Sequence, residues 1–411
     1  MAMALGSEWP KRPSAASAQR EAEGAGPHAP GTGYEGRKQW QCRDYAAQGD
    51  GMRRGAVGAV LGLGVGMAAV WKFLAKAGEG AGPWSVATVS LGVIWQSARR
   101  IMTGGGCKSC ACAGKEAVAG GAGYRVREIG ARNTLEHRLF IEDAQGRVVS
   151  PFHDIPLHPD AGDRTVVNFV VEIPRWSNAK LEISKEELMN PVRQDVKKGA
   201  LRFVHNVFPH TGYPWNYGAL PQTWEDPHAP DAATGLRGDN DPIDAIEVGG
   251  AVAAPGTVKR VRVLGCLALL DEGETDWKVV VVDVADPLAA HLHDIADVEA
   301  HCPGLLAATR AWFRDYKIPD GKPANSFAFD GQVRDRAFAL RVIEETAHAW
   351  QRLMRGEAPP GAISCANRAC ADSPYRLTPE QEARIPCAPP VAPAPAPIDP
   401  ATTMWTFLAP R

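Results

Sequence analysis

The sequence predicts an α+β domain whose β-sheet closes on itself into a small barrel. Short blocks rich in Val, Ile and Leu dominate the middle of the 411-residue chain, and Gly, Pro and Asp bound these blocks. Helical periodicity appears only later along the chain. Strands that come first and helices that come later are typical of an α+β domain, and a run of short strands favours a closed sheet.

Five segments of the middle region carry the clearest secondary-structure signals. Strands are expected at 166–173, 257–264 and 278–284, which are rich in Val and in Ile or Leu. A helix is expected over 297–316, because this segment opens on an acidic first turn. A second helix is expected over 334–354, where one face collects the apolar residues Phe338, Val342, Ala347, Trp350 and Met354.

Composition divides the chain into three regions. Residues 1–123 carry 14 Lys and Arg against 8 Asp and Glu and hold 24 of the 42 glycines, whereas 12 of the 33 prolines follow Gly356. We interpret residues 1–123 as a low-complexity leader, 124–355 as the folded domain and 356–411 as a proline-rich tail that is extended and partly docked. The net charge of −2 for the whole chain gives no general reason to expect nucleic acid as a partner.

The leader contains two short apolar runs, at 55–71 and 83–95, with basic residues beside them. Glycines at 58, 62 and 66 have the spacing that lets two helices approach closely in lipid. Three interpretations remain open: a targeting segment, a membrane anchor such as a glycine-packed hairpin, and low-complexity sequence without a function of its own. We expect targeting to a plastid or a mitochondrion, with the cytoplasm as the alternative.

Three clustered cysteines follow these runs, at Cys107, Cys110 and Cys112. A structural zinc site needs a fourth ligand, commonly from a second pair of similar spacing, and the neighbouring sequence has none. We therefore favour unstructured thiols over a metal site.

The most informative stretch of the middle region is G-D-N-D-P-I-D at 238–244, where Asp239, Asp241 and Asp244 lie within six residues. Crowded carboxylates repel one another, so they need cations, partners or raised pKa values, and hard divalent ions suit them best. An EF-hand is the wrong geometry: counted from Asp239, position 6 is Asp244 instead of Gly and position 12 is Gly250 instead of Glu. An exposed acidic loop is the alternative.

A second acidic group begins at Asp271, directly after a strand-like run. Glu274, Asp276 and Lys278 are spaced two apart, so in a strand they share one face. Two acidic groups in one domain, each beside an apolar strand, favour a site for several metal ions over an isolated acidic turn.

Basic and phenolic side chains supply the other half of a candidate site. They are Lys180, which lies two residues before Glu182, and then Arg202, Tyr213, Tyr217, Tyr316 and Lys317. Magnesium bound by carboxylates takes further ligands from phosphate oxygens, and Lys and Arg neutralise the remaining phosphate charge. Carboxylates for metals together with cations for an anion predict a phosphoryl-transfer site, although each basic residue alone would more often be solvated or packed.

Six motifs, in order, resemble the eukaryotic-type soluble inorganic pyrophosphatases of family I. They are V-E-I-P-R-W-S-N-A-K-L-E-I (171–183), L-R-F-V-H-N (201–206), P-Q-T-W-E-D-P (221–227), G-D-N-D-P-I-D (238–244), D-E-G-E-T-D-W-K (271–278) and Y-K-I-P-D-G-K-P (316–323). The likeness begins near Tyr124, continues to about Met354 and returns weakly at 396–399 and Trp405. It does not include the leader.

The resemblance implies a five-stranded OB-like closed barrel with flanking helices, a homodimer, and a catalytic domain at 124–355. It implies hydrolysis of pyrophosphate to two phosphates, by direct attack of a water activated by several Mg²⁺ ions. By the same resemblance Asp241 is the base for that water and Tyr213 is a proton donor. The implied metal ligands are Asp239, Asp244, Asp276, Asp271 and Glu182. The implied pyrophosphate ligands are Arg202, Lys180, Tyr217, Lys278, Tyr316 and Lys317. Glu172 and Glu274 are implied to contact these ligands without binding the metal ions or pyrophosphate themselves.

Other functions fit the sequence less well. An OB-like barrel can bind oligonucleotides, but a groove dense in carboxylates repels a phosphate backbone unless metals fill it. A catalytically silent scaffold is disfavoured because each matched site position has the residue type that the family pattern requires. Two short apolar runs are too few for an ion-pumping membrane pyrophosphatase.

Overall fold

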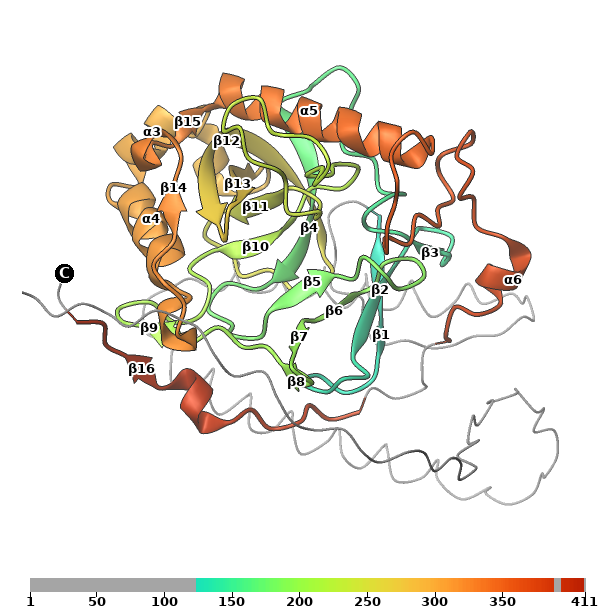
Figure 1. Cartoon of the computed structure of the whole chain (residues 1–411), viewed down its shortest axis with the longest axis horizontal. Helices are drawn as coiled ribbons and strands as arrows, with labels where there is room; N and C mark the ends of the chain where they lie inside the picture. Colours follow the sequence, from blue (N-terminus) through green and yellow to red (C-terminus); the bar gives the residue numbers. More distant parts are fainter. Residues whose placement is uncertain (1–122, 388–392, 410–411) are drawn as a thin grey trace, which may run out of the picture. The chain divides into compact units, whose positions relative to one another are not determined.

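A computed structural model describes residues 123–387 and 393–409 of the chain (Figure 1). The leader up to residue 122, with its apolar runs and the Cys107, Cys110 and Cys112 cluster, lies outside the described residues. Within the part that the structure describes, no helix is both long enough and apolar enough to cross a membrane.

Five strands form the centre of the domain, and each of them pairs with two of the others. The pairings run from β13 through β11, β10 and β4 to β12, and β12 then pairs with β13. Only the β11–β13 pair of this group is parallel. The strands are β4 (Val166–Ile173), β10 (Asn216–Ala219), β11 (Asp244–Glu247), β12 (Val258–Asp271) and β13 (Glu274–Asp283). The expected strand at 166–173 is therefore confirmed. The strands expected at 257–264 and 278–284 overlap β12 and β13.

β12 and β13 extend further than the apolar blocks of the sequence suggested, because they form one long hairpin through the acidic group. Asp271 pairs with Glu274 across Glu272 and Gly273. Both loop residues have positive φ values, 51° and 96°, as the tight turns of two-residue hairpins require. The hairpin therefore carries Asp271, Asp276 and Lys278 on two adjacent strands.

A second sheet and several short strands surround this centre. The second sheet has the order β1–β2–β6–β5, with β3 on β2. Its strands are β1 (Arg125–Ile129), β2 (Arg138–Glu142), β3 (Val148–Val149), β5 (Leu181–Ile183) and β6 (Val192–Gln194). β14 and β15 pair with β12, β7 pairs with β8, and β9 pairs with β16. Their bounds are β7 (Val196–Lys197), β8 (Ala200–Leu201), β9 (Asn206–Val207), β14 (Ser326–Phe327), β15 (Arg334–Asp335) and β16 (Trp405–Thr406).

The helices of the described residues all follow β13 in the chain (Figure 1). They are α3 (Ile295–His301), α4 (Leu305–Asp315), α5 (Arg336–Met354) and α6 (Pro379–Glu382), with 3₁₀ turns η1 (Pro287–Ala290), η2 (Ile318–Asp320), η3 (Phe329–Gly331) and η4 (Pro400–Thr403). α5 packs on β12, buries Val342 and Met354, and confirms the second expected helix. The α+β class is confirmed as well.

The single helix expected over 297–316 is wrong, because two helices occupy this stretch. α3 begins earlier, after the N-cap Asp294, whose capping box includes Asp297. It ends at His301, its C-cap residue Cys302 is followed by Pro303 and Gly304, and Gly304 has a φ of 85°. A proline lacks the N–H that a continuing helix needs and disfavours helical geometry in the residue before it, so the chain starts a new helix after Gly304.

The tail packs against the domain over its described parts. Ser364 N donates to Lys185 O at 2.7 Å, and Arg368 N donates to Asp154 Oδ1 at 2.6 Å. Further along, β16 pairs with β9 in parallel. These contacts bring the tail beside strands from the first half of the domain.

Candidate active site

The floor of the candidate site is formed where β10, β11 and β13 lie side by side. Asp244 is directly opposite Lys278 in the parallel β11–β13 pair. Lys278 Nζ lies 2.5 Å from Asp244 Oδ2 and 3.0 Å from Tyr217 Oη, and it also contacts Asp276. Tyr217 Oη donates to Asp244. Burial alone would lower the pKa of Lys278, but Asp244 and Asp276 hold it well above its usual range, so Lys278 stays a cation.

Tyr217 reaches this position because a glycine follows it. The register of β10 on β4 shifts between Tyr217 and Gly218, and a Cβ on Gly218 would lie 1.9 Å from Val170 O. Only glycine lets the two backbones approach this closely. The local sequence N-Y-G-A therefore positions the phenol of Tyr217 over the site.

Three carboxyl groups converge beside this floor. Single oxygens of Glu225, Asp239 and Asp276 all lie within 4.8 Å of one another. Burial, followed by Asp276 and Asp241, raises the pKa of Asp239 well above its usual range. Burial also raises the pKa of Asp276 to about 7, although Lys278 opposes this shift. Carboxyl groups with raised pKa values hold protons near neutral pH, and a divalent cation can replace those protons.

These side chains fit a hard metal ion. The donors are oxygen atoms only, which Mg²⁺ prefers. Among the described residues, two buried carboxylate oxygens have no hydrogen-bond partner, namely Glu225 Oε2 and Asp271 Oδ1. An orphaned buried carboxylate oxygen is costly in a protein interior, and a bound cation would satisfy it.

Asp241 differs from its acidic neighbours in exposure. Its side chain is 42% exposed, against 17% for Asp244 and 9% for Asp276. Its backbone N–H donates to Asp239 Oδ1 at 3.0 Å, and its Oδ1 lies 2.7 Å from Lys185 Nζ. It borders a cleft that is also lined by Glu172, Lys180, Glu182, Tyr217 and Asp244.

Cationic side chains gather on the other side of the site, each beside a carboxylate. Lys180 Nζ lies 2.5 Å from Glu182 Oε2 and 3.5 Å from Asp195 Oδ2. Arg202 Nη1 lies 2.5 Å from Asp195 Oδ2. Lys317 contacts Asp271, and both border a second cleft with Arg202 and the exposed Glu274. Lys180, which directly precedes β5, and Glu182 within β5 therefore lie together.

Aromatic side chains form one wall. The ring of Tyr316 stacks on Trp312 with centroids 4.7 Å apart and planes at 8°, and Tyr213 lies 4.9 Å from Trp312. Burial raises the pKa of Tyr213, while Lys180 and Arg202 oppose the shift. The phenols therefore keep their protons and act as hydrogen-bond donors.

The structure also brings in three residues that the sequence analysis did not single out: Lys185, Asp195 and Glu225. Only Glu225 had a signal, because it lies in P-Q-T-W-E-D-P. Of the expected site residues, Glu274 lies at the exposed rim by the hairpin turn, whereas Glu172 is buried and accepts from Ile183 N at 2.6 Å.

Comparison with known proteins gives consistent matches. The family model for inorganic pyrophosphatase matches residues 169–351. The Neurospora crassa inorganic pyrophosphatase is 55% identical over 290 residues, which cover 70% of this chain and 97% of the relative. The Emericella nidulans inorganic pyrophosphatase is 56% identical over 286 residues, or 70% and 98% of the two chains.

Solved structures of pyrophosphatases are similar to this chain as well. The inorganic pyrophosphatase of Schistosoma japonicum is similar with a TM-score of 0.64 and 46% identity, covering 69% of this chain and all of the other. An N-terminally truncated vacuolar soluble pyrophosphatase of Trypanosoma cruzi, in complex with PPi, is similar with a TM-score of 0.52 and 40% identity, covering 61% of this chain and 99% of the other.

Proposed function

This chain belongs to the family I soluble inorganic pyrophosphatases, and on this premise we propose that its clustered carboxylates bind Mg²⁺ while its Lys, Arg and Tyr side chains hold pyrophosphate for direct attack by water. The enzyme hydrolyses inorganic pyrophosphate to phosphate in a metal-dependent reaction. The observation that carries the site assignment is the convergence of carboxylate oxygens beside cationic and phenolic side chains.

We assign the binding of several Mg²⁺ ions to Asp239, Asp244 and Asp276, joined by Asp271 and Glu182. The oxygen-only donors, the unpartnered Asp271 Oδ1 and the raised pKa values of Asp239 and Asp276 support this set. When bound, such ions lower the pKa of a coordinated water from about 15.7 toward 7 and offset charge on the phosphates.

Asp241 is proposed as the base that orients the attacking water and accepts its proton. Its exposure supports this role, because a base must reach the water, and its side chain is more exposed than that of the neighbouring Asp244. Its backbone tie to Asp239 fixes it relative to the metal ligands. Lys185 holds the other side of the carboxylate.

Pyrophosphate is assigned to Arg202, Lys180, Tyr217, Lys278, Tyr316 and Lys317, with Tyr213 as the proton donor. Each of the lysines contacts a carboxylate that is assigned to a metal ion: Lys180 with Glu182, Lys278 with Asp276 and Lys317 with Asp271. A divalent cation competes with an ammonium group for the same oxygens. With a cation bound to these oxygens, the lysines would be free to donate to phosphate oxygens and to hold the in-line geometry.

The proposed function is tested by phosphate release from pyrophosphate. We expect turnover with Mg²⁺, its loss with a chelator and its recovery when Mg²⁺ is restored in excess, because the carboxylates need the ion to hold the substrate. Residues 124–411 should match the full chain if the leader has no catalytic role. Phosphate release that persists in chelator after dialysis against it would contradict the metal assignment.

We also propose that the five mutually paired strands form the OB-like closed barrel of the family. The return pairing of β12 with β13 and the likeness to the Schistosoma japonicum enzyme support this geometry. A crystal structure in which β4 and β12 are separated would contradict it.

A homodimer is proposed from the family resemblance. In support, exposed aromatic side chains gather near the tail: Phe208 lies 5.6 Å from Trp405 and 5.3 Å from Phe407 between ring centroids. These three side chains are 57%, 45% and 72% exposed, and clustered exposed apolar groups are typical of interaction surfaces. Sedimentation velocity of a purified chain that ran only as a monomer at micromolar concentration would contradict this proposal.

For the rest of the chain we propose a leader at 1–123, a catalytic domain at 124–355 and a docked tail at 356–411. The basic, glycine-rich composition of the leader supports a targeting signal for a plastid or a mitochondrion. The contacts of the tail with the catalytic domain support a tail that packs on this domain. A full-length chain that stays unshortened in the soluble fraction of a carbonate-washed extract would contradict both a cleaved leader and a membrane anchor.

A further inference from the structure

The carboxylate of Asp241 has one charged partner, Lys185. Lys185 Nζ lies 2.7 Å from Asp241 Oδ1, and no other cationic side chain of the described residues forms an ion pair with Asp241. The lysines that contact the proposed metal ligands compete with metal ions for those carboxylates. Asp241 is assigned no metal ion, so its contact with Lys185 can persist during the reaction. The position of Lys185 therefore bears directly on where the proposed base points.

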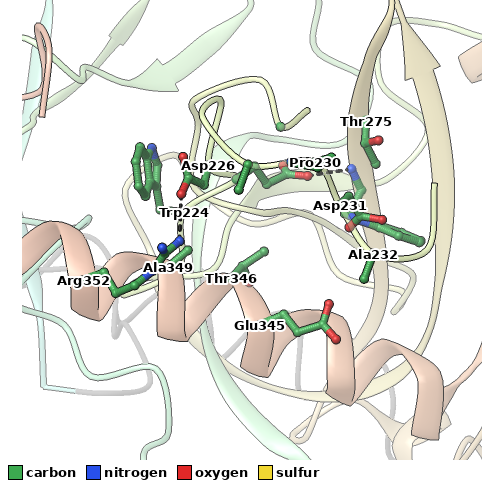
Figure 2. Close-up of a pocket in the computed structure, with 14 residues that line it drawn as sticks. Trp224, Asp226, Pro230, Asp231, Ala232, Thr275, Glu345, Thr346, Ala349 and Arg352 are labelled. Atoms are coloured by element: carbon green, nitrogen blue, oxygen red, sulfur yellow. Dashed lines mark hydrogen bonds and ion pairs between the residues drawn. The ribbon is translucent and has the colours of Figure 1, made fainter. Parts of the chain in front are cut away.

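The backbone of Asp241 is fixed independently, from the side of α5. Glu225 N donates to Asp241 O at 2.9 Å. The next residue, Asp226, is bound by Arg352 of α5, whose Nη2 lies 2.8 Å from Asp226 Oδ2 across a pocket (Figure 2). With the backbone held in this way, the direction of the Asp241 carboxylate depends on its side-chain torsions, and Lys185 is the partner that selects among them.

Lys185 lies in the segment 184–190, which follows β5 and packs around the side-chain amide of Asn190. Asn190 is fully buried. Its Nδ2 donates to Ser184 O at 3.1 Å and to Lys185 O at 3.2 Å, and its Oδ1 accepts from Ser150 Oγ at 2.7 Å. A buried amide that is bonded through both its nitrogen and its oxygen holds its partners in one geometry. The backbone of Lys185 is therefore ordered from inside the domain.

The tail holds the same segment from its other side, through the main chain of Ser364. Ser364 N donates to Lys185 O at 2.7 Å. Ser364 O accepts from Asn190 Nδ2 and from His153 Nε2, each at 3.1 Å. The indole N–H of Trp350 on α5 donates to His153 Nδ1 at 3.0 Å, so the proton of this imidazole is on Nε2. Ser364 thus links Lys185 to α5.

Apolar contacts bury the tail on both sides of Ser364. Ile363 and Cys365 are 6% and 4% exposed and belong to the main core of the domain. Ala366 packs in a small buried cluster with Met189, which comes from the segment that carries Lys185. Close-packed side chains on either side of a main-chain hydrogen bond leave the chain little freedom to shift. This part of the tail is therefore a rigid support for the Lys185 segment.

We propose that the tail residues 363–366 position the catalytic base: Ser364 fixes the backbone of Lys185, and Lys185 directs the carboxylate of Asp241 toward the attacking water. Lys185 and Ser364 are positioning residues, since neither is assigned a contact with pyrophosphate or with a metal ion. The inference rests on the proposed function, because it takes Asp241 to be the base. It makes turnover depend on a tail that supplies no reacting group.

The first test compares Lys185→Met with Lys185→Arg in the full chain, by phosphate release at saturating Mg²⁺. Lys185→Met should lower kcat about tenfold, because a small misplacement of a reacting group is costly, and should leave KM for pyrophosphate unchanged. Lys185→Arg keeps a cation that can reach Asp241, and it should recover most of the lost kcat. An unchanged kcat in Lys185→Met, a change in KM alone, or equal losses in both variants would overturn the proposal.

The second test is a double-mutant cycle with Ser364→Pro, which removes the N–H that donates to Lys185 O. Ser364→Pro should lower kcat by up to about tenfold. Its addition to Lys185→Met should lower kcat no further, because both changes act through the same contact. An unchanged kcat in Ser364→Pro, or losses that multiply in the double variant, would overturn the proposal. Ile363→Ala takes the place of Ser364→Pro if that variant does not fold, and failure of both to fold would show that the tail serves the fold instead.

Arg368→Met is the matched control, because it loosens the tail away from Lys185. Arg368 Nε donates to Val148 O at 2.7 Å, and Arg368 Nη2 lies 2.8 Å from Glu382 Oε1. This variant should keep the wild-type kcat even if its melting temperature falls, and a loss of kcat equal to that of Ser364→Pro would contradict the proposal. If the wild type released no phosphate with Mg²⁺, or if Asp241→Asn kept its turnover, the proposed function or its base would fail instead, so the failures are distinguishable.

Discussion

An Asp241→Asn variant is expected to lose pyrophosphate turnover by roughly a hundred- to ten-thousandfold, the range that general base catalysis contributes. The amide keeps the size of the side chain but cannot accept the proton of the attacking water. Metal binding should be largely kept, because the proposed ligands Asp239, Asp244 and Asp276 are unchanged. Phosphate release at saturating Mg²⁺ measures the loss.

A matched control for this variant is Lys185→Met, which removes the partner of Asp241 and keeps the carboxylate. It should lose much less turnover than Asp241→Asn, because Lys185 only holds the carboxylate in place. Near-normal turnover in Asp241→Asn would remove Asp241 from the base role. A parallel Mg²⁺ titration separates a loss of chemistry from a loss of metal.

An Asp276→Ala variant is expected to raise the Mg²⁺ concentration needed for half-maximal activity by at least about tenfold. Asp276 is buried among other carboxylates and contacts Lys278, so its removal takes away one metal ligand and one of the two carboxylates that contact Lys278. High Mg²⁺ should restore part of the turnover. The measurement is a Mg²⁺ titration of phosphate release at fixed pyrophosphate.

Asp283→Ala is the control for Asp276→Ala, because Asp283 ends the same strand and pairs with Lys259 at 2.8 Å, outside the site. It removes an ion-paired aspartate from β13 without touching the metal ligands. Its Mg²⁺ requirement should stay at the wild-type value. An unchanged titration in Asp276→Ala, or an equal shift in both variants, would exclude Asp276 as a ligand.

Local sequence patterns were sufficient for the class of the domain and for most of its strands and helices. β4 coincides with the expected strand, and α5 shows the apolar face that periodicity predicted. The errors have local causes as well. Pro303 and Gly304 divide the first expected helix, and the turn at Glu272 and Gly273 lets β12 and β13 continue through polar residues that carry no hydrophobic signal.

Long-range contacts explain what sequence reasoning missed at the site. Asp195 lies beside Lys180 through the pairing of β5 with β6 and beside Arg202 through the pairing of β7 with β8, and Lys185 reaches Asp241 from 56 positions away in the chain. No motif encodes such pairs, because they depend on strand pairing and on loops that meet only in the folded chain. Glu225 was inside a recognised motif, but its approach to Asp239 and Asp276 depends on tertiary contacts that the motif does not show.

The order and types of the motif residues were enough to establish the family and its chemistry, since carboxylates, lysines and tyrosines in those patterns suit metal ions and phosphate. Tertiary structure alone decided which carboxylates meet and how strongly they interact. The pKa of Asp276 rises to about 7 because folding buries it and brings Asp244 close from a different strand. Desolvation and Coulombic interaction depend on distances between segments far apart in the chain, and those distances exist only in the folded protein.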